Sequence, residues 1–202
     1  MNDTTRGLHP PASEAGLRRS FFWAILVIVG AFLLRLALLD VQTAEYTDGI
    51  DQLRLFVSHK SFWPPLYAAL VRLVEMTGLA PERAGRLVSA FFGSLALLPT
   101  FLLARRIFSP KTGLFAVILG MVCAVSLRWD TKVMTDSSFT ALFVTGWWLL
   151  ARFLERRSAA RFGLFLAVAG LATLTRYEGF VFLPFLAVAA ALLFDGFRRP
   201  VD

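Results

Sequence analysis

Carboxylates gather in two short polar stretches of an otherwise apolar chain. The first stretch, 40–51, contains Glu45 and Asp48, and the second, 128–137, contains Asp136. A carboxylate within hydrogen-bonding distance of a hydroxyl group can act as a general base, or it can orient a sugar hydroxyl. The two stretches could therefore supply one catalytic cavity. The alternative is a set of solvated loop acids, which composition alone favours because such acids are common on surfaces.

Asp136 is harder to explain as a solvated loop residue. It lies at the lip of a long apolar run, where an ionisable side chain is costly and usually functional. A second unusual position is the corner at 170–180, which contains Arg176 and Glu178 between two apolar runs. A tight turn at a membrane surface needs a glycine, but it has no need of an arginine and a glutamate. We interpret this corner as part of the same site.

Cations near the first stretch could bind an anion. Arg83 and Arg86 flank the point at which the chain re-enters an apolar run, and a guanidinium group can clamp a phosphate with two parallel hydrogen bonds. Anchoring of a helix end is an equal alternative for both. Arg35 lies near the end of the first apolar run, where we expect it to extend toward the membrane surface. The two histidines are far apart, so we expect no metal site.

The composition indicates a membrane protein. Hydrophobic residues make up 57% of the 202 residues, with 20 Phe and 5 Trp, and the mean hydropathy is +0.65, far above that of a soluble domain. The net charge of +7 resides in short basic clusters between apolar runs. That pattern is typical of membrane topology and not of a nucleic-acid groove. We expect no nucleic-acid partner.

A span needs about 20 apolar residues, so about six spans would use most of the chain. We predict an all-α polytopic membrane bundle whose spans lie at 20–39, 87–104, 113–127, 134–151, 159–175 and 179–194. The run 62–79 carries Arg72 and Glu75 near its middle, and these charges oppose insertion. We therefore predict a juxtamembrane helix there, lying on the membrane. We also predict a disordered cytoplasmic tail over 1–17, followed by one transmembrane module over 18–202.

Basic clusters indicate the orientation of the chain. If 62–79 does not cross, one side of the membrane receives Arg18 and Arg19, Arg105, Arg106 and Lys111, Arg152, Arg156, Arg157 and Arg161, and Arg198 and Arg199. The positive-inside rule makes that side the cytoplasm. We predict a multi-pass protein of the cell (inner) membrane with a cytoplasmic amino terminus and with its acidic loops on the outer face.

Several short segments resemble the GT-C fold glycosyltransferases of family 39, the protein O-mannosyltransferase and aminoarabinose transferase type. In chain order they are Tyr46-Thr-Asp48-Gly49, Pro64-Pro65-Leu66-Tyr67, Arg86-Leu87-Val-Ser, Leu103-Ala-Arg105-Arg106-Ile-Phe, Thr135-Asp136 and Gly170-Leu-Ala-Thr-Leu-Thr-Arg176-Tyr-Glu178-Gly179. Members of this family are typically much longer. The resemblance therefore implies an amino-terminal module of the GT-C type.

The resemblance implies an activity and a set of partners. The expected reaction transfers a hexose or pentose from a polyprenyl-phosphate donor to a lipid, glycan or protein acceptor on the outer, extracytoplasmic face of the membrane. No cofactor is expected. The alternative is a non-catalytic membrane subunit, or a partner that binds the lipid carrier, with the same fold.

The resemblance also implies roles for individual residues. Asp48 best matches the catalytic base of the first outer loop, with Glu45 as its rival, and Asp136 matches the acid of the second outer loop. The remaining expected residues are four cations for the donor phosphate, namely Arg83, Arg86, Lys60 and Arg176, and two further cavity residues, Tyr46 and Glu178.

Overall fold

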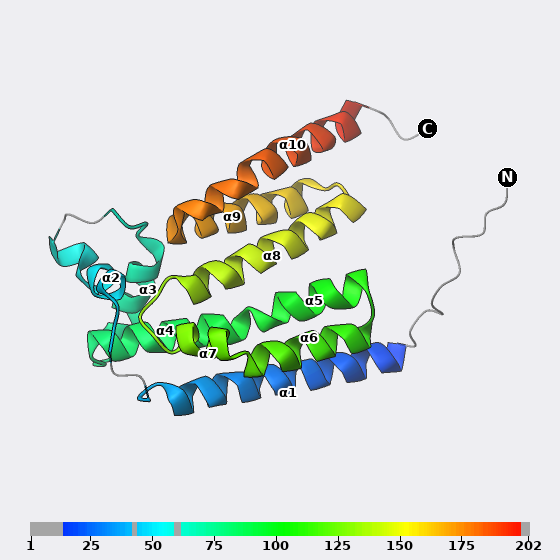
Figure 1. Cartoon of the computed structure of the whole chain (residues 1–202). Coiled ribbons are helices and arrows are strands. Elements are labelled where there is room, and N and C mark those ends of the chain that lie inside the picture. The colour runs from blue at the N-terminus through cyan, green and yellow to red at the C-terminus, as the bar shows by residue number, and fades with distance from the viewer. Residues whose placement is uncertain (1–13, 42–43, 59–61, 199–202) are drawn as a thin grey trace.

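The computed structural model describes residues 14–41, 44–58 and 62–198, and every regular element in these ranges is a helix (Figure 1). The expected all-helical membrane bundle is confirmed. Most of the expected amino-terminal tail lies outside the described residues, and so does Lys60. The first helix, α1 (Glu14–Leu38), begins within the last residues of that expected tail.

Four helical segments are long and apolar enough to cross a membrane. They are α1, the nearly continuous pair α4 (Pro81–Leu95) and α5 (Leu97–Ile107), α8 (Asp136–Glu155), and the 3-10 helix η1 (Tyr177–Val181) with α10 (Phe182–Arg198) that follows it. Each coincides with an expected span, although the second begins earlier in the chain than its apolar run.

The two remaining expected spans are short or bent. α6 (Pro110–Val122) and α7 (Ala124–Asp130) meet at an angle of 59° and give a fifth span if they are counted as one. α9 (Ala159–Thr175) has 17 residues, which is the lower limit for a spanning helix. By length and composition the described residues contain four or five spans, where the sequence led us to expect about six.

The spans run alternately in opposite directions, so the connections between them gather at two ends of the bundle (Figure 1). One end, here called the acidic end, carries α2 (Thr47–Ser58), α3 (Leu66–Glu75), and the α7–α8 and α9–α10 connections. The other, the basic end, carries the α5–α6 and α8–α9 turns. There Arg106 pairs with Glu155, and Arg161 donates a hydrogen bond to the backbone oxygen of Arg152. Acidic loops and basic clusters therefore separate as expected.

α3 lies at the acidic end and is too short to cross the membrane. Its 10 residues extend about 15 Å, against a hydrocarbon thickness of about 30 Å. Tyr67 and Val71 are buried against α4, whereas Leu73 and Met76 on the opposite side are exposed. The prediction that 62–79 does not cross is confirmed.

Aromatic side chains fill the core between the spans. Phe182 packs into a cluster between α8, α9 and α10, and a Cβ atom at Gly146 would lie 2.6 Å from its ring. A second cluster joins α1 to α5 and α6 around Phe101. Large apolar side chains such as Leu33 of α1 and Phe194 of α10 remain exposed, as expected of helix surfaces that face lipid.

The two-ended arrangement predicts a labelling pattern. Cysteines placed at Thr47 and Tyr177 should react with a membrane-impermeant thiol reagent from one side of the membrane, because both positions lie at the acidic end. A cysteine at Lys111, at the basic end, should react from the opposite side. Cys123 is exposed and must first be replaced by serine. Labelling of Thr47 and Tyr177 from opposite sides would contradict the arrangement.

Candidate functional site

Glu45 is a buried carboxylate whose two oxygen atoms both accept hydrogen bonds from the protein. Oε1 accepts one from Arg86 Nε at 2.5 Å, and Oε2 accepts one from the backbone nitrogen of Val133 at 3.0 Å. Arg86 also donates from Nη1 to the backbone oxygen of Leu39 at 3.0 Å. The Glu45 and Arg86 side chains are only 7% and 10% exposed. Glu45 therefore ties the first acidic stretch to α4 and to the α7–α8 connection.

Tyr46 is held by one aromatic ring and two cations. Its ring stacks on Trp129 with the centroids 5.4 Å apart, and the Lys132 ammonium group lies 4.3 Å from its centroid. Its hydroxyl group accepts a hydrogen bond from Arg128 Nη2 at 2.8 Å. Lys132 in turn donates to the backbone oxygen of Ala44 at 3.1 Å. These contacts fix the backbone that leads into α2.

Gly49 lets α2 lie directly on the α7–α8 connection. A Cβ atom at this position would be 2.3 Å from the backbone oxygen of Val133, so a larger residue would lift the helix away. Gly85 of α4 approaches the same residue, since its Cβ atom would be 2.9 Å from Val133 Cγ1. The glycine of the Tyr-Thr-Asp-Gly segment therefore sets the position of the first turn of α2, which contains Asp48.

Asp48 is an exposed carboxylate close to Arg176. Within the described ranges it takes part in no hydrogen bond or ion pair. The hydrogen bond from Arg176 to Glu178 raises the pKa of Arg176, and the charges of Asp136, Glu178 and Asp48 act in the same direction. Asp136 pairs with this guanidinium group, whereas Asp48 acts on it through its charge without forming an ion pair.

Arg176 bridges two further acids. Its Nη1 lies 2.9 Å from Asp136 Oδ1, and its Nη2 lies 2.7 Å from Glu178 Oε1. Asp136 Oδ2 is buried without a hydrogen-bond partner in the described structure. An unsatisfied buried oxygen is costly and calls for a functional explanation. The site therefore holds one buried, unpaired carboxylate oxygen beside a guanidinium group.

Tyr67, from the proline-pair segment, is fully buried near these acids. Its hydroxyl group donates to the backbone oxygen of Gly85 at 2.9 Å and lies 3.0 Å from Ser89 Oγ. Burial raises the pKa of Tyr67, and the charges of Glu45 and Asp136 raise it further. The hydroxyl group stays protonated at neutral pH, so Tyr67 holds α3 against α4 and is not a candidate base.

The other cations expected at a donor phosphate are placed differently. Arg83 lies on the surface of α4, 62% exposed and 3.6 Å from Asp40. Arg86 is buried and occupied by protein partners. Lys60 lies outside the described residues. Of the four expected cations, Arg176 is the one that the described structure pairs with Asp136, whereas Arg86 pairs with Glu45.

Asp130 forms a buried ion pair with Arg35 that sequence reasoning missed. Arg35 is 0% exposed, and its Nη2 and Nε lie 2.7 and 2.8 Å from Asp130 Oδ2. Ser137 donates to Oδ1 at 2.6 Å, and a Cβ atom at Gly93 would collide with the carboxylate. The expected extension of Arg35 toward the membrane surface is wrong, because an internal carboxylate replaces water as its partner. The sequence did contain a signal for this pair, because Arg35 and Asp130 both lie near the ends of apolar runs that finish on the same side of the membrane.

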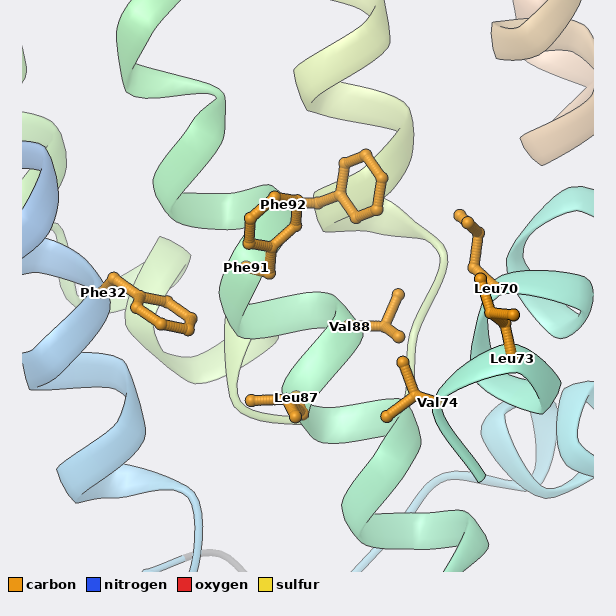
Figure 2. A pocket seen from close by; sticks show the side chains of 8 residues that line it. All are labelled: Phe32, Leu70, Leu73, Val74, Leu87, Val88, Phe91 and Phe92. Carbon is orange, nitrogen blue, oxygen red and sulfur yellow. The ribbon is translucent and has the colours of Figure 1, made fainter. Parts of the chain in front are cut away.

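Two cavities in the described structure are lined by residues other than these acids. The larger, about 360 Å³, lies over α4 between Phe32 of α1 and Leu70 and Leu73 of α3 (Figure 2). The second, about 320 Å³, lies between α9 and the η1–α10 segment. Neither is lined by Asp48 or Asp136. The outward-facing cavity expected around the two acids is not one of these, and Asp48 lies on the exposed surface.

A comparison with protein families covers the larger part of the chain. Residues 63–201 match the family model described as dolichyl-phosphate-mannose-protein mannosyltransferase. No curated protein matches the chain significantly, and neither does any solved structure. The matched region runs from the proline pair through α10 and contains Asp136 and Arg176, whereas Glu45 and Asp48 precede it.

The buried pair of Arg35 and Asp130 predicts an asymmetric response to mutation. Arg35→Met should lower the free energy of unfolding by about 3–5 kcal/mol, because it leaves the Asp130 carboxylate buried without a counter-charge. The double variant Arg35→Met/Asp130→Leu should recover much of this loss, because no charge remains to be compensated. Unfolding of the purified protein in detergent measures both.

The control for this experiment is Arg72→Met. Arg72 pairs with Glu75 on the surface of α3, with its side chain 70% exposed, and exposed pairs contribute at most about 1 kcal/mol. If Arg35→Met and Arg35→Met/Asp130→Leu lowered the free energy of unfolding equally, the unpaired Asp130 charge would not be the cause of the destabilisation.

Proposed function

The chain belongs to the dolichyl-phosphate-mannose-protein mannosyltransferase family, and from this membership we propose that it transfers a sugar from a polyprenyl-phosphate donor to an acceptor hydroxyl group at the acidic end of the bundle. Members of this family are membrane glycosyltransferases. The observation that carries the choice of site is the ion pair between Asp136 and Arg176, a guanidinium group on which the charge of Asp48 also acts. The acidic end is proposed to face outward, with the amino terminus in the cytoplasm, following the positive-inside rule.

The proposed reaction is a displacement at the anomeric carbon of the donor sugar. The acceptor oxygen forms a bond to this carbon, while the bond from the carbon to the phosphate oxygen breaks and polyprenyl phosphate leaves with the electron pair. Asp48 takes the proton from the acceptor hydroxyl group as the new bond forms. Positive charge beside the leaving phosphate stabilises the negative charge that it gains.

Asp48 is a better base than Glu45 in this arrangement. A general base must present an oxygen within hydrogen-bonding distance of the substrate proton. Asp48 is exposed and has no partner among the described residues, whereas Arg86 and the backbone of Val133 occupy the two oxygens of Glu45. Glu45 then serves the site by holding the backbone that precedes α2.

Asp136 and Arg176 are proposed to bind substrate. Oδ1 of Asp136 is engaged by Arg176, and Oδ2 has no hydrogen-bond partner in the described structure, so Oδ2 can accept a hydrogen bond from a sugar hydroxyl group that reaches it. Glu178 holds the guanidinium group from its other side at 2.7 Å. The raised pKa of Arg176 keeps it charged throughout the neutral and alkaline range, so its binding role should not depend on pH there.

Asp48→Asn should lower turnover by about 10²-fold or more, because asparagine keeps the shape of the side chain but cannot take a proton. The unfolding temperature should stay unchanged, since the carboxylate has no partner to lose. Transfer of radiolabelled sugar from a panel of polyprenyl-phosphate donors, in membranes that contain the full chain, measures the effect. Asp51→Asn, an exposed position on the same helix, is the matched control and should retain transfer.

Glu45→Gln separates the two candidate bases. It should lower the unfolding temperature as well as activity, because it removes the charge that Arg86 pairs with. Near-complete transfer by Asp48→Asn, together with loss of transfer by a stably folded Glu45→Gln, would reassign the base to Glu45. Donor binding by the wild type without transfer to any acceptor would favour a non-catalytic partner that binds the lipid carrier.

A further inference from the structure

Lys132 is a buried ammonium group without a carboxylate partner. The residue is 6% exposed, and its Nζ donates to the backbone oxygen of Ala44 and lies over the Tyr46 ring. In the described part of the chain no carboxylate oxygen lies within 4.0 Å of it. Buried lysines are normally paired because desolvation of the charge is costly. A positive charge without an ion-pair partner among the described residues is therefore held beneath the surface at this point.

Arg128 supplies a second positive charge on the same tyrosine, and this one is exposed. Its Nη2 donates to the Tyr46 hydroxyl group at 2.8 Å, and its guanidinium carbon lies 5.7 Å from the Trp129 ring. It too has no carboxylate within 4.0 Å among the described residues. Among the described residues, other arginines on this side, including Arg35, Arg72, Arg83, Arg86 and Arg176, do pair with carboxylates.

We propose that Arg128, Lys132 and the Tyr46 hydroxyl group form a binding site for the phosphate ester of a lipid. Arg128 is exposed and uses Nη2 for Tyr46, which leaves its remaining N–H groups for a phosphate oxygen. The Tyr46 oxygen accepts from Arg128, so its own proton is free to be donated to the same ligand. Lys132, under the ring, adds attraction through a region from which water is excluded.

The position of the site indicates that a lipid carries the phosphate. Arg128 and Trp129 lie in the last turn of α7, whose Val125 is 66% exposed and apolar. Tryptophan concentrates at the surface of a bilayer, which is also the level of lipid phosphates. Two sources share this chemistry, a polyprenyl phosphate and an anionic phospholipid.

If the ligand is a polyprenyl phosphate, the site would bind the phosphate of the sugar donor. This assignment rests on the proposed function. Tyr46 precedes Asp48 by two residues, so a phosphate held there lies near the proposed base. Arg86, which the sequence suggested for this role, is occupied by Glu45. Binding of a phosphate ester as such does not depend on any transfer activity.

The test is a titration of the purified full chain in detergent with three probes: undecaprenyl phosphate, phosphatidylglycerol and inorganic phosphate. Native mass spectrometry measures the bound fraction. Arg128→Gln should weaken undecaprenyl phosphate binding about tenfold or more, because a charge-assisted contact is lost. Arg72→Gln removes an exposed arginine that is paired elsewhere, and it should change binding by less than about twofold.

The three probes separate the possible outcomes. Arg128-dependent binding of undecaprenyl phosphate above phosphatidylglycerol supports the site and its role with a donor. Equal, Arg128-dependent binding of both lipids supports the phosphate site but removes its link to the proposed function. Unchanged binding of all three probes by Arg128→Gln, with an unfolding temperature equal to that of the wild type, overturns the proposal. Failure of Asp48→Asn to affect transfer would instead count against the proposed function alone.

Discussion

The ion pair between Arg35 and Asp130 fixes the part of the chain on which the candidate site depends. Asp130 is held by Arg35 of α1 and Ser137 of α8, and Gly93 of α4 leaves room for its carboxylate. The next residues form the α7–α8 connection, which supplies the Val133 backbone nitrogen to Glu45. A displacement of this connection would therefore reach the first acidic stretch without any change in that stretch itself.

The buried ion pairs explain which acidic side chains are engaged by the protein itself and which are not. Burial of a charge is costly unless it is paired within the protein, and Glu45 and Asp130 are paired in this way with Arg86 and Arg35. Asp48 lies at the exposed surface and escapes the requirement. The buried acids therefore hold the backbone, whereas Asp48 remains exposed.

The sequence was sufficient for the large features because they follow from hydropathy and charge. The positions of the spans, the short α3 and the gathering of the acidic loops at one end all depend on local patterns. Pairings between helices carry no such signal. Arg35 and Asp130 are 95 residues apart, and nothing local distinguishes Glu45, which is buried, from Asp48, which is not. The difference in burial arises because α4 and the α7–α8 connection enclose Glu45, and these contacts join residues far apart in the sequence.

Where the short apolar helices α9 and α6 face lipid, their length has a consequence for the surrounding membrane. The 17 residues of α9 extend about 25 Å and the 13 residues of α6 about 20 Å, both less than a typical hydrocarbon thickness of about 30 Å. Lipid beside a short span thins, or flanking polar side chains extend to reach water, at a modest energetic cost. The bend after α6 adds to this mismatch, because α7 turns away from the direction of α6. Next to α7 the lipid head groups would therefore lie deeper than in the undisturbed bilayer. A head group would then have a shorter distance to cover before it contacts α7.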